Sequence, residues 1–272
     1  MPASDGPPVT VAQAAALDPH APIQPNTDDS SDVDSALGGS SVESDTTSLA
    51  SSVLNYKYEN GRRYHSYREG KYVLPNDEQE QERQDILHHV RVLTLDGKLF
   101  RSPISSNPHH VLDLGTGTGI WAIDFADEFP SAQVIGTDLS PIQPSWIPPN
   151  LTFIVDDIEA DWLEDWSQRY DYIHGRDLGG SVSDWSKLYS QAFRCLKPGG
   201  WIEMQEFEVW IMSDDDTLKK APSLIQLQEL IDEASTKLGK QMNVANEQKQ
   251  RLINAGFEDV TDDVYKVLSV WS

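Results

Sequence analysis

The sequence predicts an α/β domain in which a mostly parallel β-sheet is covered by helices on both faces. Three observations carry this prediction. Apolar runs alternate with helical segments from residue 110 onward, a glycine-rich loop follows the first run, and an aspartate ends the second. Alternation of this kind implies βαβ crossovers. At 272 residues the chain can bury one such core and still carry an additional segment.

Residues 1–55 are expected to form a disordered acidic tail. The segment is rich in Ser, Asp, Thr, Pro and Ala, and the first 56 residues hold eight acids and no Lys or Arg. Such a composition buries too little apolar surface to offset the entropy cost of ordering. The tail is either a passive extension or a segment that is phosphorylated or binds a partner.

Residues 56–272 are predicted to be the folded domain, beginning with an aromatic and basic segment and a helix over 56–109. Asn76 is the predicted N-cap of that helix, with Gln79 as its reciprocal partner. Four apolar residues then recur at helical spacing, and we expect this face to lie on the main domain. They are Ile86, Leu87, Val90 and Leu93.

The core proper is predicted over residues 110–272. The expected strands are 110–115, 132–138, 151–156, 170–175, 200–211 and 259–270. The expected helices are 119–129, 184–196, 223–238 and 245–255, with a short helical turn near 160–166. Cys195 falls on the apolar face of an amphipathic helix and is expected to be a core residue.

Composition excludes several classes of protein. The net charge of −23 lacks the basic footprint of a duplex DNA or RNA binder, so no direct nucleic-acid partner is expected. A single cysteine fits a reducing compartment, and no signal peptide or membrane-spanning run of about 20 residues is present in the sequence. No metal-ligand spacing is found either. We expect a cytoplasmic or nuclear protein without a metal or a membrane partner.

The glycine loop indicates a nucleotide-like ligand. Its spacing is Asp113-x-Gly115-x-Gly117-x-Gly119, one residue shorter than the dinucleotide-binding fingerprint, and no Lys-Ser/Thr pair follows as in a P-loop. Glycines between a strand and a helix let the backbone approach a ligand closely. Asp138 would accept hydrogen bonds from ribose hydroxyls of either an adenosyl cofactor or a nicotinamide dinucleotide.

Downstream motifs separate the two cofactors. The chain has "LTFIVDDIEADW" at the third strand and "RCLKPGGWIEMQE" ahead of the fifth. Together with "DLGTGTG" and "GTDLS", these resemble the class I S-adenosylmethionine-dependent methyltransferases, which have a Rossmann-like doubly wound sheet. The segments "GRRYHSYREGKYVLPNDEQEQERQDILHH", "DLSPIQPSWIPPN" and "YDYIHGRDLGGSVSDW" further resemble the fungal LaeA-like methyltransferases, over residues 56 to about 266.

The resemblance implies contacts with S-adenosylmethionine. Asp113 would face its ammonium group, Asp138 its ribose, and Asp157 the adenine edge, with Asp156 as the competing residue. Leu139 and Ile158 would sandwich the adenine. The residues expected along the methionine part are Gly115, Thr116, Gly117 and Gly119.

Three further residues are assigned with the resemblance in view. His174 and Arg176 sit at the carboxyl end of the fourth strand, the edge that faces the ligand crevice in doubly wound sheets. His174 is a candidate general base, or alternatively a structural residue, and Arg176 a cofactor-binding residue. Tyr64 and its aromatic neighbours would cover the cofactor as a lid, where electron-rich rings attract a sulfonium; the alternative is an arm packed on the domain.

The predicted function is methyl transfer from S-adenosylmethionine to a small-molecule or protein acceptor, in secondary metabolism or its regulation. The resemblance leaves two alternatives open: a nuclear regulatory subunit that acts through protein partners, and a catalytically inactive relative. Members of the family continue beyond the position of "EDVTDDVYKV", so the final antiparallel strand is expected to be missing here and one edge of the sheet poorly covered.

Overall fold

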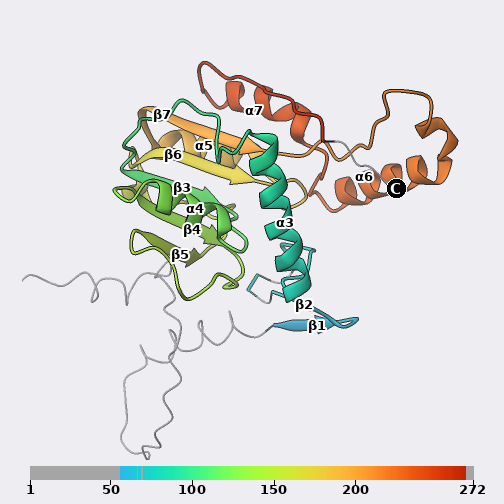
Figure 1. Ribbon diagram of the computed structural model, residues 1–272, viewed down its shortest axis with the longest axis horizontal. Helices are drawn as coiled ribbons and strands as arrows, with labels where there is room; N and C mark the ends of the chain where they lie inside the picture. The colour runs from blue at the N-terminus through green and yellow to red at the C-terminus, as the bar shows by residue number, and fades with distance from the viewer. Residues whose placement is uncertain (1–55, 66, 69, 268–272) are drawn as a thin grey trace, which may run out of the picture.

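A five-stranded sheet forms the centre of the computed structural model, which describes residues 56–65, 67–68 and 70–267 (Figure 1). Its strand order is β5-β4-β3-β6-β7, and every neighbouring pair is parallel. The strands are β3 (His110–Leu114), β4 (Gln133–Asp138), β5 (Leu151–Val155), β6 (Tyr170–Arg176) and β7 (Leu196–Gln205). The first strand of the sheet, β3, lies in its middle, and the strand order reverses between β3 and β6. Such sheets bind ligands at this point, beyond the carboxyl ends of the strands. The predicted α/β class is confirmed.

Helices cover both faces of the sheet and one of its ends. Helix α4 packs on one face, α5 and α7 pack on the other, and α3 runs across the end toward which the strands point (Figure 1). The helices are α3 (Glu78–Thr94), α4 (Ile120–Glu128), α5 (Trp185–Cys195), α6 (Pro222–Lys237) and α7 (Gln248–Asn254). Short 3₁₀ turns lie at Glu164–Trp166, Leu218–Lys220 and Ala245–Glu247, and a hairpin of β1 (Lys57–Glu59) and β2 (Arg62–Tyr64) precedes α3.

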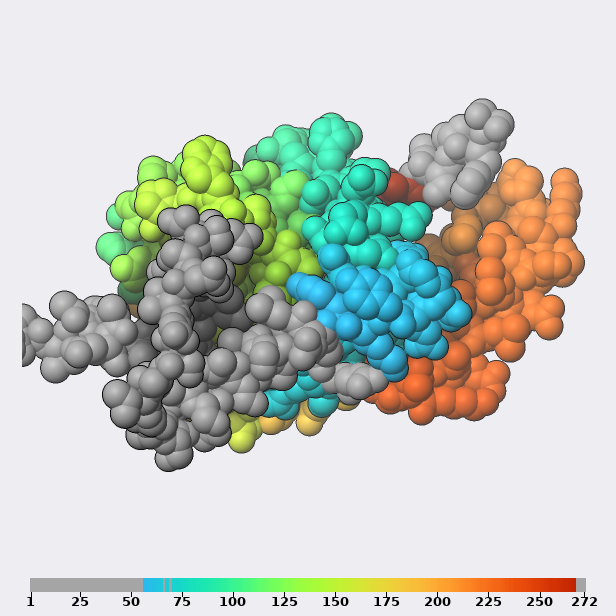
Figure 2. Space-filling view, turned by 90° about the horizontal axis from the view of Figure 1, so that it is seen from below, coloured from blue at the N-terminus to red at the C-terminus, as the bar shows by residue number. Residues whose placement is uncertain are grey.

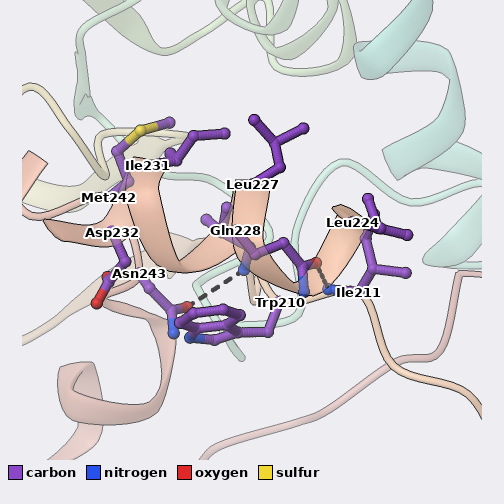
Figure 3. Close-up of a pocket in the computed structure, with 10 residues that line it drawn as sticks. Trp210, Ile211, Leu224, Leu227, Gln228, Ile231, Asp232, Met242 and Asn243 are labelled. Carbon is purple, nitrogen blue, oxygen red and sulfur yellow. Dashed lines mark hydrogen bonds between the residues drawn. The ribbon is translucent and has the colours of Figure 1, made fainter. Parts of the chain in front are cut away.

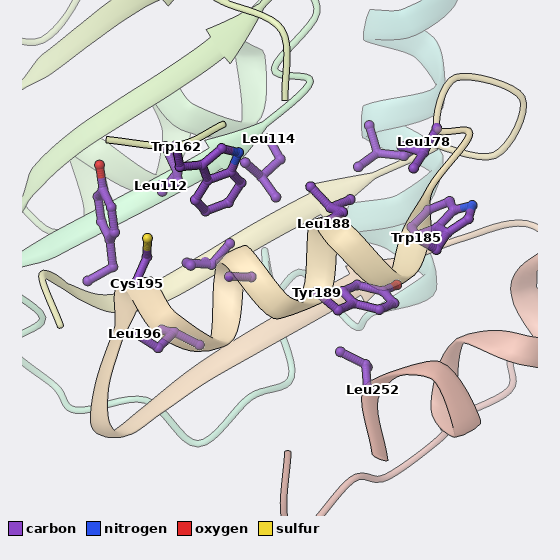
Figure 4. Close-up of a cluster of buried hydrophobic side chains, with 14 of the residues drawn as sticks. Leu112, Leu114, Trp162, Leu178, Trp185, Leu188, Tyr189, Cys195, Leu196 and Leu252 are labelled. Carbon is purple, nitrogen blue, oxygen red and sulfur yellow. The ribbon is translucent and has the colours of Figure 1, made fainter. Parts of the chain in front are cut away.

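The central strand β3 shows how the sequence pattern builds two cores. Side chains alternate across a strand, so Leu112 and Leu114 enter the core under α5, while Val111 enters the core under α4. Figure 4 shows the first of these cores, in which Leu188 of α5 and Trp162 meet the two leucines and Cys195 is buried as predicted. Burying these strands on both faces explains their nearly continuous apolar runs.

Helix α3 begins one residue later than predicted. Asp77, and not Asn76, is the N-cap, because its Oδ1 accepts a hydrogen bond from the backbone N–H of Glu80 at 3.1 Å. Asn76 instead donates through Nδ2 to Ser140 Oγ at 3.3 Å, which ties the segment before α3 to the loop after β4. The Arg62 guanidinium also holds the Asp77 carboxylate and lowers its pKa.

The face by which α3 packs differs in part from the prediction, because Leu87 and Val90 are half-buried but the other two predicted residues are exposed. Ile86 and Leu93 are 65% and 63% exposed, whereas His88 is buried. Polar partners explain the difference, since His88 Nε2 contacts Asp124 Oδ2 of α4 at 2.9 Å. Apolar periodicity alone could not reveal this face.

The C-terminal strands were also predicted wrongly in part. The last core strand begins at Leu196 and ends at Gln205, so residues 206–211 leave the sheet, and Val209 and Ile211 are exposed. Residues 259–267, the described part of the predicted strand 259–270, adopt no strand. The predicted disordered tail, residues 1–55, lies outside the described residues.

Candidate functional site

A cavity of about 270 Å³ opens at the carboxyl ends of the strands. Its floor is the glycine loop after β3 and the ends of β4 and β5. Residues 71–76 and α3 form one wall, and residues 206–209 with Lys240 and Met242 form another. Figure 2 shows the N-terminal segment and α3, in blue and teal, between the sheet domain and the C-terminal residues in orange. The site is therefore assembled from both ends of the chain.

The glycine loop has no room for side chains at two of its positions. Gly115 and Gly117 have φ angles of +63° and +58°, in the left-handed region. A Cβ on Gly115 would lie 2.5 Å from Leu178 Cδ2, and one on Gly117 would lie 2.4 Å from Gln84 Oε1. The loop is thus closely packed at the head of α4, and its backbone lines the cavity at Gly115 and Gly117.

Asp113 lies beneath this loop and does not line the cavity. Its Oδ2 accepts from Thr116 Oγ1 at 2.5 Å, and its Oδ1 contacts His174 Nδ1 at 2.7 Å. Thr116 also donates its backbone N–H to the Thr137 carbonyl at 2.9 Å, and it does line the cavity. Asp113 therefore holds the shape of the loop from below, and any effect on a ligand passes through Thr116.

His174 is fully buried and stacked on a tryptophan. Its ring lies 3.6 Å from that of Trp121 with an angle of 7° between the planes. Asp113 and His174 are register partners on β3 and β6, on the face covered by α4. His174 does not line the cavity, and its Nε2 has no hydrogen-bond partner among the described residues. This geometry favours a structural role for His174 over that of a general base.

Asp138 ends β4 at the floor of the cavity. Its Oδ2 accepts the backbone N–H of Gly117 and its Oδ1 that of Ser140, both at 2.9 Å. Burial raises the pKa of this carboxyl to about 6, against the lowering effect of the two backbone donors. Each carboxylate oxygen can accept a second hydrogen bond, so Asp138 is oriented by the loop and still able to bind hydroxyl groups.

The end of β5 supplies the residues expected around an adenine. Asp156, Asp157 and Ile158 line the cavity, as does Leu139 after β4. Asp156 Oδ1 accepts the Asp157 backbone N–H at 2.8 Å. Asp157 Oδ1 accepts the Glu159 N–H at 3.0 Å, and its Oδ2 pairs with Arg68 at 3.1 Å. Both acids thus lie at the same end of the cavity, and Asp157 also forms an ion pair with the N-terminal segment.

The aromatic segment does cover the cavity, through a different tyrosine. Tyr64 belongs to β2 and does not line the cavity, whereas Tyr72 does. Burial raises the pKa of Tyr72, and Asp138 is the next largest cause. His65 fixes this turn, because its Nδ1 lies 2.8 Å from the Tyr67 carbonyl and its Nε2 lies 3.2 Å from the Tyr72 carbonyl.

Arg176 lines the cavity at the end of β6 and is linked to α3. Its Nη1 lies 3.0 Å from His88 Nδ1, and burial lowers its pKa. Arg91 of α3 pairs with Asp177 and lies over the ring of Phe207, 3.7 Å from the centroid. These contacts join α3 to both sides of the cavity.

Sequence reasoning missed Glu206, which lines the cavity just after β7. Its two oxygens accept the backbone N–H groups of Leu178 at 2.9 Å and Gly179 at 3.0 Å. Burial raises its pKa to about 7, assisted by Asp177 and opposed by Arg91 and the two donors. A signal was present, because an acid at the carboxyl end of a parallel strand faces the ligand crevice, but the strand was predicted to continue past it.

Neither a metal centre nor a membrane-spanning helix is found in the described part of the chain. No group of three or more His, Cys, Asp or Glu side chains in it is placed to hold a metal ion. No helix among these residues is long and apolar enough to cross a membrane.

The fold and cavity define a class I methyltransferase, and comparison with known proteins agrees. Residues 86–262 match the family described as "Methyltransferase domain". The chain belongs to this family of S-adenosylmethionine-dependent enzymes, and its relatives place it in the LaeA-like group.

Three fungal relatives are similar to the chain. Methyltransferase pytC of Aspergillus terreus is 42% identical over 227 residues, covering 83% of this chain and 69% of the relative. Secondary metabolism regulator LAE1 of Cochliobolus heterostrophus is 41% identical over 216 residues, covering 77% and 69%. Protein-methionine methyltransferase laeA of Emericella nidulans is 44% identical over 162 residues, covering 59% and 43%.

Proposed function

We propose that the cavity binds S-adenosylmethionine and that the chain transfers its methyl group to a small-molecule or protein acceptor. The observation that carries this proposal is Asp138, held by Gly117 and Ser140 at the floor of a cavity that the glycine loop also lines. An acid in this position receives the two ribose hydroxyls of an adenosyl group. When bound, the cofactor supplies a methyl group activated by a positively charged sulfur.

The other residues divide the cavity into two ends. Leu139 and Ile158 offer apolar surface for the adenine, with Asp157 or Asp156 accepting from its amino group. At the opposite end, Gly115 and Thr116 border the methionine part, and Arg176 is the cation placed to pair with its carboxylate. Tyr72 and residues 74–76 cover the ligand from the N-terminal side. Catalysis then comes largely from holding two reactants in line and excluding water.

Binding of S-adenosylhomocysteine tests the cofactor assignment directly. Calorimetric titration is expected to show saturable binding of this product, and no binding of NAD. Binding of NAD in place of S-adenosylhomocysteine would instead support the nicotinamide alternative left open by the glycine loop.

The affinity for S-adenosylhomocysteine is expected to fall as pH decreases through about 6, the raised pKa of Asp138. Ribose hydroxyls donate to the ionised carboxylate, so binding must expel any proton that Asp138 carries. Below pH 6 the affinity should weaken by up to about tenfold per pH unit, because one proton is displaced. Titrations of wild type and Asp138→Asn from pH 5 to 7.5 measure this effect, and the variant should show a flatter profile.

Unfolding has the opposite pH dependence at this residue, which separates the two effects. The folded pKa of Asp138 lies above its unfolded value, so the folded protein binds more protons between about pH 4 and 6. Protonation of Asp138 in this window therefore stabilises the ligand-free fold. A lower ligand affinity at pH 5 cannot then be ascribed to destabilisation of the fold by protonation of Asp138.

A second function is favoured by the relatives, since LAE1 of Cochliobolus heterostrophus is a secondary metabolism regulator. In that case the chain would act through protein partners, in the nucleus, and cofactor binding would serve assembly. Turnover of S-adenosylmethionine with fractionated extract as acceptor source supports the enzyme. Co-purification with stable partners, without any methylated product, supports the regulatory subunit.

A further inference from the structure

A second, apolar pocket of about 140 Å³ lies between α6 and the segment that leaves β7. Leu227 and Ile231 of α6, Met242 and Trp210 line this pocket. In Figure 3, the first three side chains extend upward and Trp210 lies below α6. The remaining lining residues are Val209, Ile211, Leu224, Gln228, Asp232 and Asn243. Only two of these residues also line the cofactor cavity.

Those shared walls are Val209 and Met242, which line both the apolar pocket and the cofactor cavity. Gly179 marks the boundary on the sheet side. A Cβ on Gly179 would lie 2.6 Å from the Met242 carbonyl oxygen and 3.3 Å from Glu206 Oε2. Met242, which lines both spaces, therefore lies close to the carboxylate of Glu206, which lines the cofactor cavity.

Two backbone N–H groups of the pocket wall already have side-chain partners. The Ile211 backbone N–H donates to Gln228 Oε1 at 2.6 Å, and that of Val209 donates to Asn243 Oδ1 at 3.2 Å (Figure 3). The wall thus offers mainly aliphatic and indole surface to an occupant. Glu206 differs, because each of its oxygens accepts one backbone N–H and retains a lone pair for another donor.

We propose that this pocket holds the apolar body of a small-molecule methyl acceptor, and that Glu206 accepts a hydrogen bond from the acceptor's hydroxyl group. This inference rests on the proposed function, which places the methyl donor in the adjoining cavity. The size of the pocket supports an apolar ring, because an aliphatic cavity of about 150 Å³ binds benzene. The shared walls Val209 and Met242 place such a ring beside the cofactor cavity. Its hydroxyl would extend past them toward Glu206, and a buried hydroxyl would otherwise lack a partner.

Binding of phenol, measured by calorimetric titration in the presence of saturating S-adenosylhomocysteine, tests the pocket. Leu227→Asp is expected to weaken binding at least tenfold, because it places a charge on the apolar wall. Leu230→Asp is the matched control, since Leu230 lies on the same helix, is similarly exposed (54% against 52% for Leu227), and does not line the pocket. Equal effects of the two substitutions, or no binding to wild type, would overturn the proposal.

Comparison of phenol with benzene tests Glu206. Wild type is expected to prefer phenol several-fold, and Glu206→Met, which has a similar length but no carboxylate acceptor, should remove this preference while benzene binding is unchanged. A preference that persists in Glu206→Met contradicts the assigned hydrogen bond. Each titration is repeated without S-adenosylhomocysteine, so that failure of the cofactor product to bind counts only against the proposed function.

Discussion

Asp138→Ala is expected to weaken S-adenosylhomocysteine binding at least tenfold in a protein that remains folded. The substitution removes two charge-assisted hydrogen bonds to ribose, worth roughly 1.5–3 kcal/mol each before compensation. It also removes the acceptor of the Gly117 and Ser140 backbone N–H groups, which loosens the cradle. Calorimetric titration measures the loss, and a thermal melt establishes folding.

Asp127→Ala is the control for this experiment, because Asp127 is exposed on α4 away from the cavity. Its affinity for S-adenosylhomocysteine should match that of wild type. Unchanged affinity in folded Asp138→Ala would show that the ribose is bound elsewhere.

Gly119→Ala is expected to destabilise the protein by roughly 2–5 kcal/mol, against about 1–2 kcal/mol for Gly97→Ala. Both glycines have a φ of +81°, so each substitution carries the same cost of left-handed backbone. At Gly119 the new Cβ would lie 2.3 Å from Phe153 Cζ, whereas at Gly97 nothing lies within 4 Å. The difference isolates packing of the glycine loop on a rigid ring.

Urea denaturation of the two variants and wild type measures these free energies of unfolding. A ligand-binding titration of Gly97→Ala should be normal, since this glycine follows α3 outside the cavity. Equal destabilisation by the two substitutions would mean that the ring of Phe153 moves aside without cost.

The central strands could be predicted because their side chains follow simple periods. Val111 and Leu112 enter opposite cores, and the runs around them are apolar enough to require burial on both faces. The glycine spacing can also be predicted from the sequence, because the loop needs residues with positive φ. Asp138 can be predicted because it ends β4, at the edge of the sheet that faces a ligand. Gly115, Thr116, Gly117, Asp138 and the end of β5 accordingly line one cavity, as predicted, whereas Asp113 and Gly119 do not line it.

Other parts of the site depend on contacts between distant residues, which the sequence pattern does not reveal. His174 lies in register with Asp113 inside the sheet, and the position of a strand's end decides whether such a residue reaches the crevice. Residues 206–211 alternate acidic and apolar side chains at their start, as a strand does, yet they leave the sheet, and residues 209–211 line a pocket beside α6. The lid uses Tyr72 in place of Tyr64, because a turn held by His65 sets which ring faces inward.

The position of α3 has a consequence for synthesis of the protein on the ribosome. This helix emerges before the sheet that receives it, and its contact Arg91–Asp177 spans 86 residues of chain. At about 5–20 residues per second, Asp177 is synthesised roughly 4–17 s after Arg91. During that interval α3 can contact α4, through His88 and Asp124, but not Asp177. The cofactor cavity is completed later still, once residues 206–209, Lys240 and Met242 have been made.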